Sequence, residues 1–381
     1  MYLALRELRF ARARFGLMGG VIALISVLVV LLSGLSSGLV NDGVSGLKNM
    51  KVTAFAFNEG TKTDNAFSRS VVDQGQADAW ADQPGVAAVS LMGSTIVNGT
   101  AGDDDTQVDL SLFGVEPDSF VSPEIGEGRD AQAPDEVVIS PTGLDEGMQI
   151  GDVVTLDRIG TELTVVGVTA EQATFGHVTI GFLPLQTWQY IASGQAEPGA
   201  PTEERIAAVG FDTASTVAIL AEDGAELDFA AGDAAADTVT STLRESFDAS
   251  PGYTAETLTL QMIQVFLYAI CALVVGAFFT VWTIQRTHEI AVLRAVGAST
   301  GYLLRDGLAQ AVIILVLSTV VGVALGLGLG AVMPAAAPFA LEPAPIAVAT
   351  ALTIGLGLIG AALAIIRISR VDPLSALGGQ R

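Results

Sequence analysis

Cysteine, histidine and charged side chains are all scarce in this sequence. Its 381 residues include one cysteine and two histidines, and 15% of them are charged. A single cysteine excludes disulfides within the chain. So few cysteines and histidines leave no credible Ser/His/Asp or Cys/His arrangement, and the sequence predicts no enzymatic active site. A phosphate-binding loop of the form G-x-x-x-x-G-K-[ST] is also missing, which excludes that way of binding ATP by this chain.

The few residues that could bind a metal have simpler interpretations. His177 lies at the expected edge of a strand, and we expect it to be a lone surface histidine. The run Asp103, Asp104 and Asp105 lacks the rest of an EF-hand pattern, so we expect a solvated turn. The sequence therefore predicts no firm metal site.

Charge is absent from four long stretches, residues 15–41, 257–285, 307–341 and 343–366. Each is at least as long as the roughly 20 residues that a helix needs to cross a bilayer. Backbone groups in lipid must be satisfied within the segment, so these stretches have to be helices. The sequence predicts transmembrane helices over residues 17–39, 259–284, 303–333 and 346–366. The first run is longer than a signal-peptide core, and we expect a retained anchor.

The basic residues are unevenly distributed along the chain. Ten of the 18 precede the first span, separate the second from the third, or follow the fourth. The positive-inside rule then predicts cytoplasmic segments at residues 1–16, 285–302 and 367–381, with both termini in the cytoplasm. Residues 40–258 become a large outer domain, and residues 334–345 a short outer loop.

The sequence of the expected outer domain predicts an α+β fold. Its patterns predict a first strand at residues 51–57, a helix at 68–82, and a mobile loop or a weak helix at 221–237. Further strands are expected at residues 86–97, 107–115, 136–140, 152–156 and 162–168, and a short helix at 187–193. Strands and helices alternate without a regular βαβ repeat. The fold class is a membrane protein with four transmembrane helices and an α+β domain between helices 1 and 2. Its acidic surface argues against nucleic-acid binding there.

An amphipathic segment follows the second span and reads R-T-H-E-I-A-V-L-R-A-V-G-A-S over residues 286–299. Gly297 fits a helix stop, and Ser299 fits the start of the next element. Periodicity alone is also compatible with an interfacial helix that only connects two spans.

This segment resembles the coupling-helix signature of the MacB/FtsX-type ABC transporter permeases. The stretch from Ile139 to Val168, the closing motif from Arg370 to Leu377 and the arginine-rich helix from Leu3 to Phe15 resemble the same superfamily. The resemblance implies a permease that works as a homodimer with a separate ATPase dimer, which binds the ATP. It assigns ATPase coupling to Arg286, Glu289, Ile290, Leu293, Arg294 and Gly297, and His288 to the same contact.

Within the superfamily, the N-terminal run and the first span are most similar to haem-efflux permeases. Haem as cargo would need aromatic or apolar walls and an iron ligand, for which Met50 or Glu59 are the candidates. The expected haem-binding residues flank the outer ends of the first two spans: Asn49, Met50, Phe55, Phe57, Glu59, Tyr253, Met262, Phe266 and Tyr268. For any single one of these residues, interfacial anchoring or packing is the simpler interpretation, since aromatics gather at bilayer edges. Export of peptides, lipids or antibiotics, or FtsX-like signalling to a cell-wall hydrolase, stays open.

Overall fold

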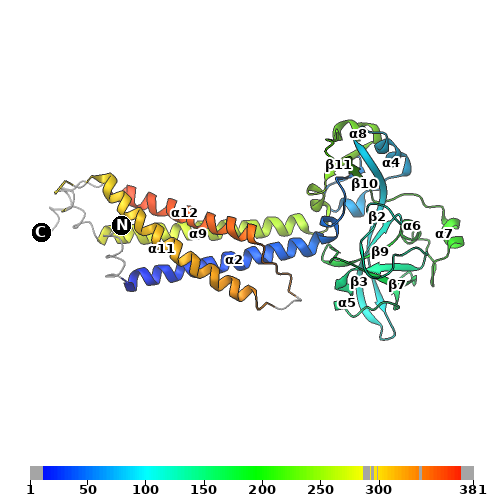
Figure 1. Ribbon diagram of the computed structural model, residues 1–381, viewed down its shortest axis with the longest axis horizontal. Coiled ribbons are helices and arrows are strands. Elements are labelled where there is room, and N and C mark those ends of the chain that lie inside the picture. The colour runs from blue at the N-terminus through cyan, green and yellow to red at the C-terminus, as the bar shows by residue number, and fades with distance from the viewer. Residues whose placement is uncertain (1–11, 286–291, 293–295, 298, 334–336, 370–381) are drawn as a thin grey trace. The chain divides into compact units, whose positions relative to one another are not determined.

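The computed structural model describes residues 12–285, 292, 296–297, 299–333 and 337–369 (Figure 1). The chain divides into two compact units. We call Met1–Gly38 together with Thr257–Arg381 the helical unit, and Leu39–Glu256 the sheet domain.

Four helices of the described residues are long and apolar enough to cross a membrane. They are α2 (Arg12–Lys48), α9 (Tyr253–Gln285), α11 (Thr300–Gly330) and α12 (Pro343–Ser369). The four-helix prediction is therefore confirmed, and each helix runs a few residues beyond its expected span except at the end of α11. Ser299 is the N-cap of α11, because its hydroxyl accepts a hydrogen bond from the Tyr302 amide at 3.2 Å.

Glycines let the helices of the helical unit approach closely. Gly322 of α11 lies against Ala23 and Ser26 of α2, and Gly360 of α12 lies against Ala272 of α9. A Cβ at either glycine would come within 2.4 Å of a backbone oxygen of the neighbouring helix. Small residues at helix contacts are the usual way in which apolar helices pack in lipid.

A mixed sheet of eleven strands forms the sheet domain, in the order β11-β1-β10-β2-β3-β9-β5-β7-β4, with β6 paired to β2 and β7, and β8 to β9. Only the pairs β3–β9 and β5–β7 are parallel. The strands are β1 (Ala54–Asn58), β2 (Val86–Ala101), β3 (Thr106–Val115), β4 (Ile125–Gly128), β5 (Glu136–Ile139), β6 (Val153–Leu156), β7 (Glu162–Thr169), β8 (Thr174–Phe175), β9 (Val178–Pro184), β10 (Thr216–Ala221) and β11 (Thr238–Thr242). Between them lie α3 (Ala66–Arg69), α4 (Gln74–Ala81), α5 (Pro141–Asp145), α6 (Leu185–Ala192), α7 (Glu203–Val209), α8 (Phe229–Ala236) and the 3-10 helix η1 (Glu245–Ala249). The α+β prediction is confirmed.

The prediction of a single helix over residues 68–82 is wrong. Residues 68–82 form α3 and α4 separately, because Val72 between them pairs with Ala214 in an isolated β-bridge. Asp73 then begins α4 with a capping box, in which its side chain accepts from the Gln76 amide and the Gln76 side chain accepts from the Asp73 amide.

In residues 221–237 a helix does form: α8 packs on α4, and Gly232 lies against the Trp80 ring. Asp103, Asp104 and Asp105 are exposed in the turn between β2 and β3.

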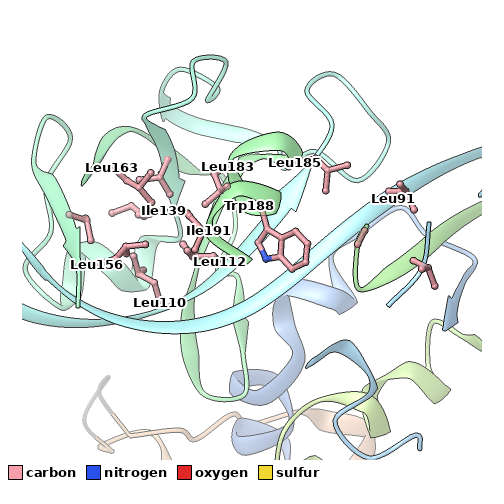
Figure 2. Packing of buried hydrophobic residues seen from close by; sticks show 14 of the residues in the cluster. Leu91, Leu110, Leu112, Ile139, Leu156, Leu163, Leu183, Leu185, Trp188 and Ile191 are labelled. Atoms are coloured by element: carbon pink, nitrogen blue, oxygen red, sulfur yellow. The ribbon is translucent and has the colours of Figure 1, made fainter. Parts of the chain in front are cut away.

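Both faces of the sheet are buried, each under its own apolar cluster. Alternating residues of β3 divide between them, since Leu110 and Leu112 join one cluster and Phe113 the other. Trp188 of α6 is central to the first cluster (Figure 2). Its ring covers Gly93 of β2 and Gly114 of β3, where a Cβ would come within 2.1 and 2.3 Å of the side chain.

The glycine at position 93 should therefore be required for stability. We expect Gly93→Ala to lower the free energy of unfolding by about 1–3 kcal/mol, because the added methyl group overlaps the Trp188 ring. Urea unfolding of the purified chain, followed by tryptophan fluorescence, measures the change. Gln186→Ala, at an exposed position of the same α6 helix, is the control and should stay within about 0.5 kcal/mol. Equal stability of Gly93→Ala and the wild type would contradict this packing.

Candidate functional site

The sheet domain contains a cavity of about 630 Å³ beside the end of α2. This volume lies in the range of small-molecule sites, roughly 300–1,000 Å³. Asn49 and Met50 line it from the turn that follows α2, Phe120 and Val121 from the β3–β4 loop, and Phe182 from β9. The remaining lining residues are Gly46, Lys51, Asp118, Ser119, Ser122, Pro123, Glu124, Asp130, Thr169, Glu171 and Ala173.

The β3–β4 loop is held in shape by its own hydrogen bonds. The hydroxyls of Ser119 and Ser122 both donate to the Glu116 carbonyl, at 2.6 and 2.9 Å. The Ala170 amide donates to the Glu124 carbonyl at 2.8 Å, which fixes the loop against the end of β7. The aromatic wall of the cavity is thus built on a defined backbone.

Negative charge dominates the polar part of this lining. Asp118, Glu124, Asp130 and Glu171 face one basic residue, Lys51. Among the described residues, none of these four carboxylates forms an ion pair. Burial raises the pKa of Asp130, and the nearby negative charges of Asp118 and Glu136 raise it further, against the Ala131 amide hydrogen bond that lowers it. The cavity therefore favours a positively charged ligand over an anionic one.

An ion pair anchors the segment that carries Asp130. Arg129 donates to both carboxylate oxygens of Glu136, and the amides of Gln132 and Ala133 donate to the same group at 3.0 and 3.1 Å. The bond from Arg129, ahead of those from the amides, lowers the pKa of Glu136 to about 2. Because four donors bind its carboxylate, Glu136 holds the segment of residues 129–133 in place.

Of the nine expected haem-binding residues, the structure brings Asn49 and Met50 together in this cavity. The Asn49 amide donates to the Gln172 carbonyl at 3.0 Å, so it also has a structural contact. Phe55 and Phe57 are 0% and 4% exposed and pack edge-on against Phe67 in the core.

Glu59 is exposed just beyond the far end of β1, roughly 17 Å from the start of that strand. Tyr253 packs on Phe247 within the sheet domain, and Tyr268 is buried in the core of the helical unit. Burial and packing thus account for several aromatic residues that the sequence placed at the site.

Met262 and Phe266 lie differently, on an exposed face of α9. They belong to a stripe of large apolar residues spaced four apart, in which Leu258, Met262, Phe266 and Ile270 are 56, 59, 67 and 48% exposed. Residues four apart share one face of a helix. Within the most apolar window, 17% of the α9 residues are buried against 44% of those of α2, so the described part of the chain leaves most of this window of α9 at least partly exposed.

The expected coupling segment is described only in part. Val296 donates to the Val292 carbonyl at 3.1 Å, as in a helical turn, and Gly297 has a φ of +104°, which favours glycine. The other expected coupling residues, Arg286, Glu289, Ile290, Leu293 and Arg294, lie outside the described residues, as does His288.

Sequence reasoning missed the acidic side of the cavity and the surroundings of His177. Asp118, Asp130 and Glu171 are far apart in the sequence, and no motif joins them. His177 is half-buried and contacts Asp42 and Glu256 through its two ring nitrogens. The turn-forming pair Gly176-His177 was the one local sign that the chain reverses there.

Two protein-family models match this chain. The model of the MacB-like periplasmic core domain matches residues 15–237, and the model of the FtsX-like permease C-terminal region matches residues 262–373.

Full-length relatives share about a quarter of their residues with this chain. A "Putative hemin transport system permease protein HrtB" of Staphylococcus epidermidis is 24% identical over 388 residues, covering 100% of this chain and 99% of the relative. An uncharacterized ABC transporter permease of Mycobacterium tuberculosis is 26% identical over 387 residues, with the same coverage.

Solved structures show weaker likeness. The periplasmic region of MacB from Actinobacillus actinomycetemcomitans is 14% identical, with a TM-score of 0.36, covering 52% of this chain and 94% of that one. The extracellular domain of the noncanonic ABC-type transporter YknZ from Gram-positive bacteria is 14% identical, with a TM-score of 0.31, covering 45% of this chain and 84% of that one.

The Glu136 anchor gives the cavity a testable pH dependence. Its lowered pKa means that its stabilising effect is present above 4.5, the ordinary value, and is lost as the pH falls through about 2. We expect Glu136→Gln to lower the melting temperature at pH 7 and to flatten its decline between pH 4.5 and 2. Thermal unfolding across this range measures both effects. Glu226→Gln, the same charge change at an exposed site, should leave both unchanged. If the two variants behave alike, Glu136 does not anchor the loop.

Proposed function

Because the chain belongs to the MacB/FtsX family of ABC transporter permeases, we propose that it is the membrane subunit of an ATP-driven exporter and that its cargo is haem. The proposal places the chain in the cell membrane, with both termini in the cytoplasm and the sheet domain outside. The basic residues that flank the apolar helices support this orientation, since they gather in the segments assigned to the cytoplasm.

The exposed stripe on α9 is the observation that carries the choice of cargo. Haem is flat and apolar, and its iron accepts a methionine thioether as axial ligand. Met262 and Phe266 offer a thioether and an aromatic ring one helical turn apart, on a face that the described residues leave exposed. Two relatives of Staphylococcus epidermidis that span the full chain carry hemin transport in their names, which supports the same cargo.

Charge favours this stripe over the cavity as the haem site. Haem carries two carboxylates, and the cavity lining holds four carboxylates against one lysine. Like charges at short range in a partly buried site repel strongly. We therefore propose Met262 as the iron ligand, in place of Met50 or Glu59.

A homodimer would complete this site. Little of α9 is buried within one chain, and a second copy would set two stripes of Leu258, Met262, Phe266 and Ile270 opposite each other. Cargo dissolved in the lipid could then enter from the side between the two copies. A separate ATPase dimer, docked on the segment 286–297, would supply the energy, because ATP binding that favours one arrangement of the helices shifts the equilibrium toward it.

Haem binding is tested directly by titrating the detergent-purified chain and following the Soret band. We expect a saturable shift that is lost in the double variant Met262→Ala/Phe266→Ala and kept in Val281→Ala. Val281 is the matched control, since it is an exposed apolar residue on the same helix, at 54% exposure. A shift that survives the double variant would remove the stripe as the site. The absence of any shift in the wild type would discard haem and leave the permease assignment in place.

A second cargo class is favoured by the acidic cavity. A cationic amphiphile, such as a basic peptide or antibiotic, would match four carboxylates beside the apolar wall of Phe120, Val121 and Phe182. Calorimetric titration with the tetraphenylphosphonium cation tests this reading. We expect binding to weaken at least about tenfold in Asp130→Asn/Glu171→Gln, because loss of a close charge costs about one such factor. Binding that is unchanged in this variant would rule out the cavity as a cation site.

A further inference from the structure

A continuous series of hydrogen bonds joins the end of α2 to the β8–β9 hairpin, entirely within the sheet domain. The Asn49 side-chain amide donates to the Gln172 carbonyl. The Ser45 hydroxyl lies 2.7 Å from the Thr174 hydroxyl and accepts a hydrogen bond from the Thr174 backbone amide at 2.9 Å. The next contact, from the Gly176 amide to the Gly43 carbonyl, measures 2.9 Å. We call this series the α2 seam.

The Gly43 carbonyl is available because α2 is broken at this point. Val44 has a φ of −144° and a ψ of 16°, outside the helical region. The carbonyl before the break accepts from the Gly176 amide and also from the Ser250 hydroxyl, at 3.1 Å. A freed helix carbonyl that is buried needs such partners. The sheet domain therefore hydrogen-bonds α2 at the position where the backbone of this helix departs from helical geometry.

His177 extends the seam to a second helix. Its Nδ1 lies 2.8 Å from Oδ2 of Asp42 on α2, and its Nε2 lies 2.9 Å from Oε2 of Glu256 in the first turn of α9. Ionised carboxylates only accept hydrogen bonds, and a neutral imidazole has one N–H to donate. Both contacts are satisfied together only by the imidazolium, so the bridge requires a protonated His177.

The backbone at this turn is compatible with histidine but does not require it. Gly176 and His177 have φ values of +61° and +64°, which is the pattern of a tight hairpin turn in which Asn or Gly is preferred at both positions. Histidine is one of the few non-glycine residues enriched at positive φ, so the turn accepts His177 but does not by itself account for its two carboxylate contacts.

We propose that His177 is a positioning residue for transport, which in its protonated form ties the end of α2 and the start of α9 to one hairpin of the sheet domain. The role in transport rests on the proposed function, whereas the tie itself does not. With the tie in place, a displacement of either helix end moves the other and the hairpin with it. Without it, this charged link between the two helix ends and the hairpin is lost.

The charges around His177 set the pH range of the tie. Burial lowers the pKa of His177, but the hydrogen bonds and charges of Asp42 and Glu256 outweigh it, so the pKa stands above the ordinary 6.5. Tyr253 of α9 is another titratable group beside Gly43, and Glu146, the C-cap of α5, is an acidic group that interacts with Asp42. A raised histidine pKa means that the stabilisation is complete below pH 6.5 and is lost as the pH rises through the pKa of His177.

The tie is tested in the full chain by histidine-selective NMR. The chain has two histidines, so ring labelling gives two titrating signals, and loss of one in His177→Asn assigns it. We expect a His177 pKa above 6.5 that falls toward 6.5 in Asp42→Asn/Glu256→Gln. A wild-type His177 that titrates at or below 6.5 would overturn the proposal.

The His177→Asn variant distinguishes a role of the His177 side chain in the tie from a role in forming the turn alone. Asn suits a positive φ better than His does, so a residue needed only for the turn would tolerate the change. The tie predicts the opposite: exchange of the Gly176 amide should become about tenfold faster below pH 6.5 in His177→Asn, and should not change above the pKa of His177. Unchanged exchange at all pH values would contradict the tie.

A transport assay distinguishes the existence of the tie from its role in transport. With the ATPase present, we expect cargo moved per ATP to fall in the wild type as the pH rises through the pKa of His177, and to be low at every pH in His177→Asn. Identical pH profiles would refute the positioning role while leaving the exporter assignment intact. A raised pKa together with no transport by the wild type would instead retain the tie and refute the exporter.

Discussion

Strands β1 and β11 pair in antiparallel register, from Ala54 opposite Thr242 to Asn58 opposite Thr238. These are the first and last strands of the sheet domain, so their pairing makes the chain enter and leave the domain at one place. The Leu243 amide donates to the Thr53 carbonyl and extends the pairing toward both helix ends. A domain inserted between two long apolar helices needs such closure, because the helix ends can share contacts only if they come close together. The α2 seam and the His177 bridge both depend on it.

The sheet domain supports these contacts from within. Apolar clusters cover both faces of its sheet, and the aromatic one, which includes Phe67, Phe113 and Phe175, lies on the same face as Leu47 at the end of α2. Tight aromatic packing transmits displacement because interiors are dense and have little room to deform. The acidic cavity opens beside the same helix end. The cavity and the contacts of the sheet domain with the end of α2 therefore share one region of the domain.

Much of this architecture could be predicted from the sequence, because the signals were local. Charge-free runs located the four helices, and Ser299 was recognisable as a start of α11 because a cap acts over three residues. Contacts between distant segments could not be predicted. The break between α3 and α4 depends on Val72 pairing with Ala214, and the partners of His177 are 135 and 79 residues away in the chain. Phe55 and Phe57 were correctly placed on a strand, but alternation alone does not tell whether a strand is covered on both faces.

Movement of haem across a bilayer tests most directly the proposal that this chain is the membrane subunit of a haem exporter. The chain would be reconstituted into liposomes with its ATPase partner, with haem in the membrane and apo-myoglobin as acceptor on the side of the sheet domain. The account predicts ATP-dependent transfer of haem to the acceptor that saturates with haem and stops without the ATPase. ATP hydrolysis by the assembled complex with no transfer above the ATP-free rate would contradict it.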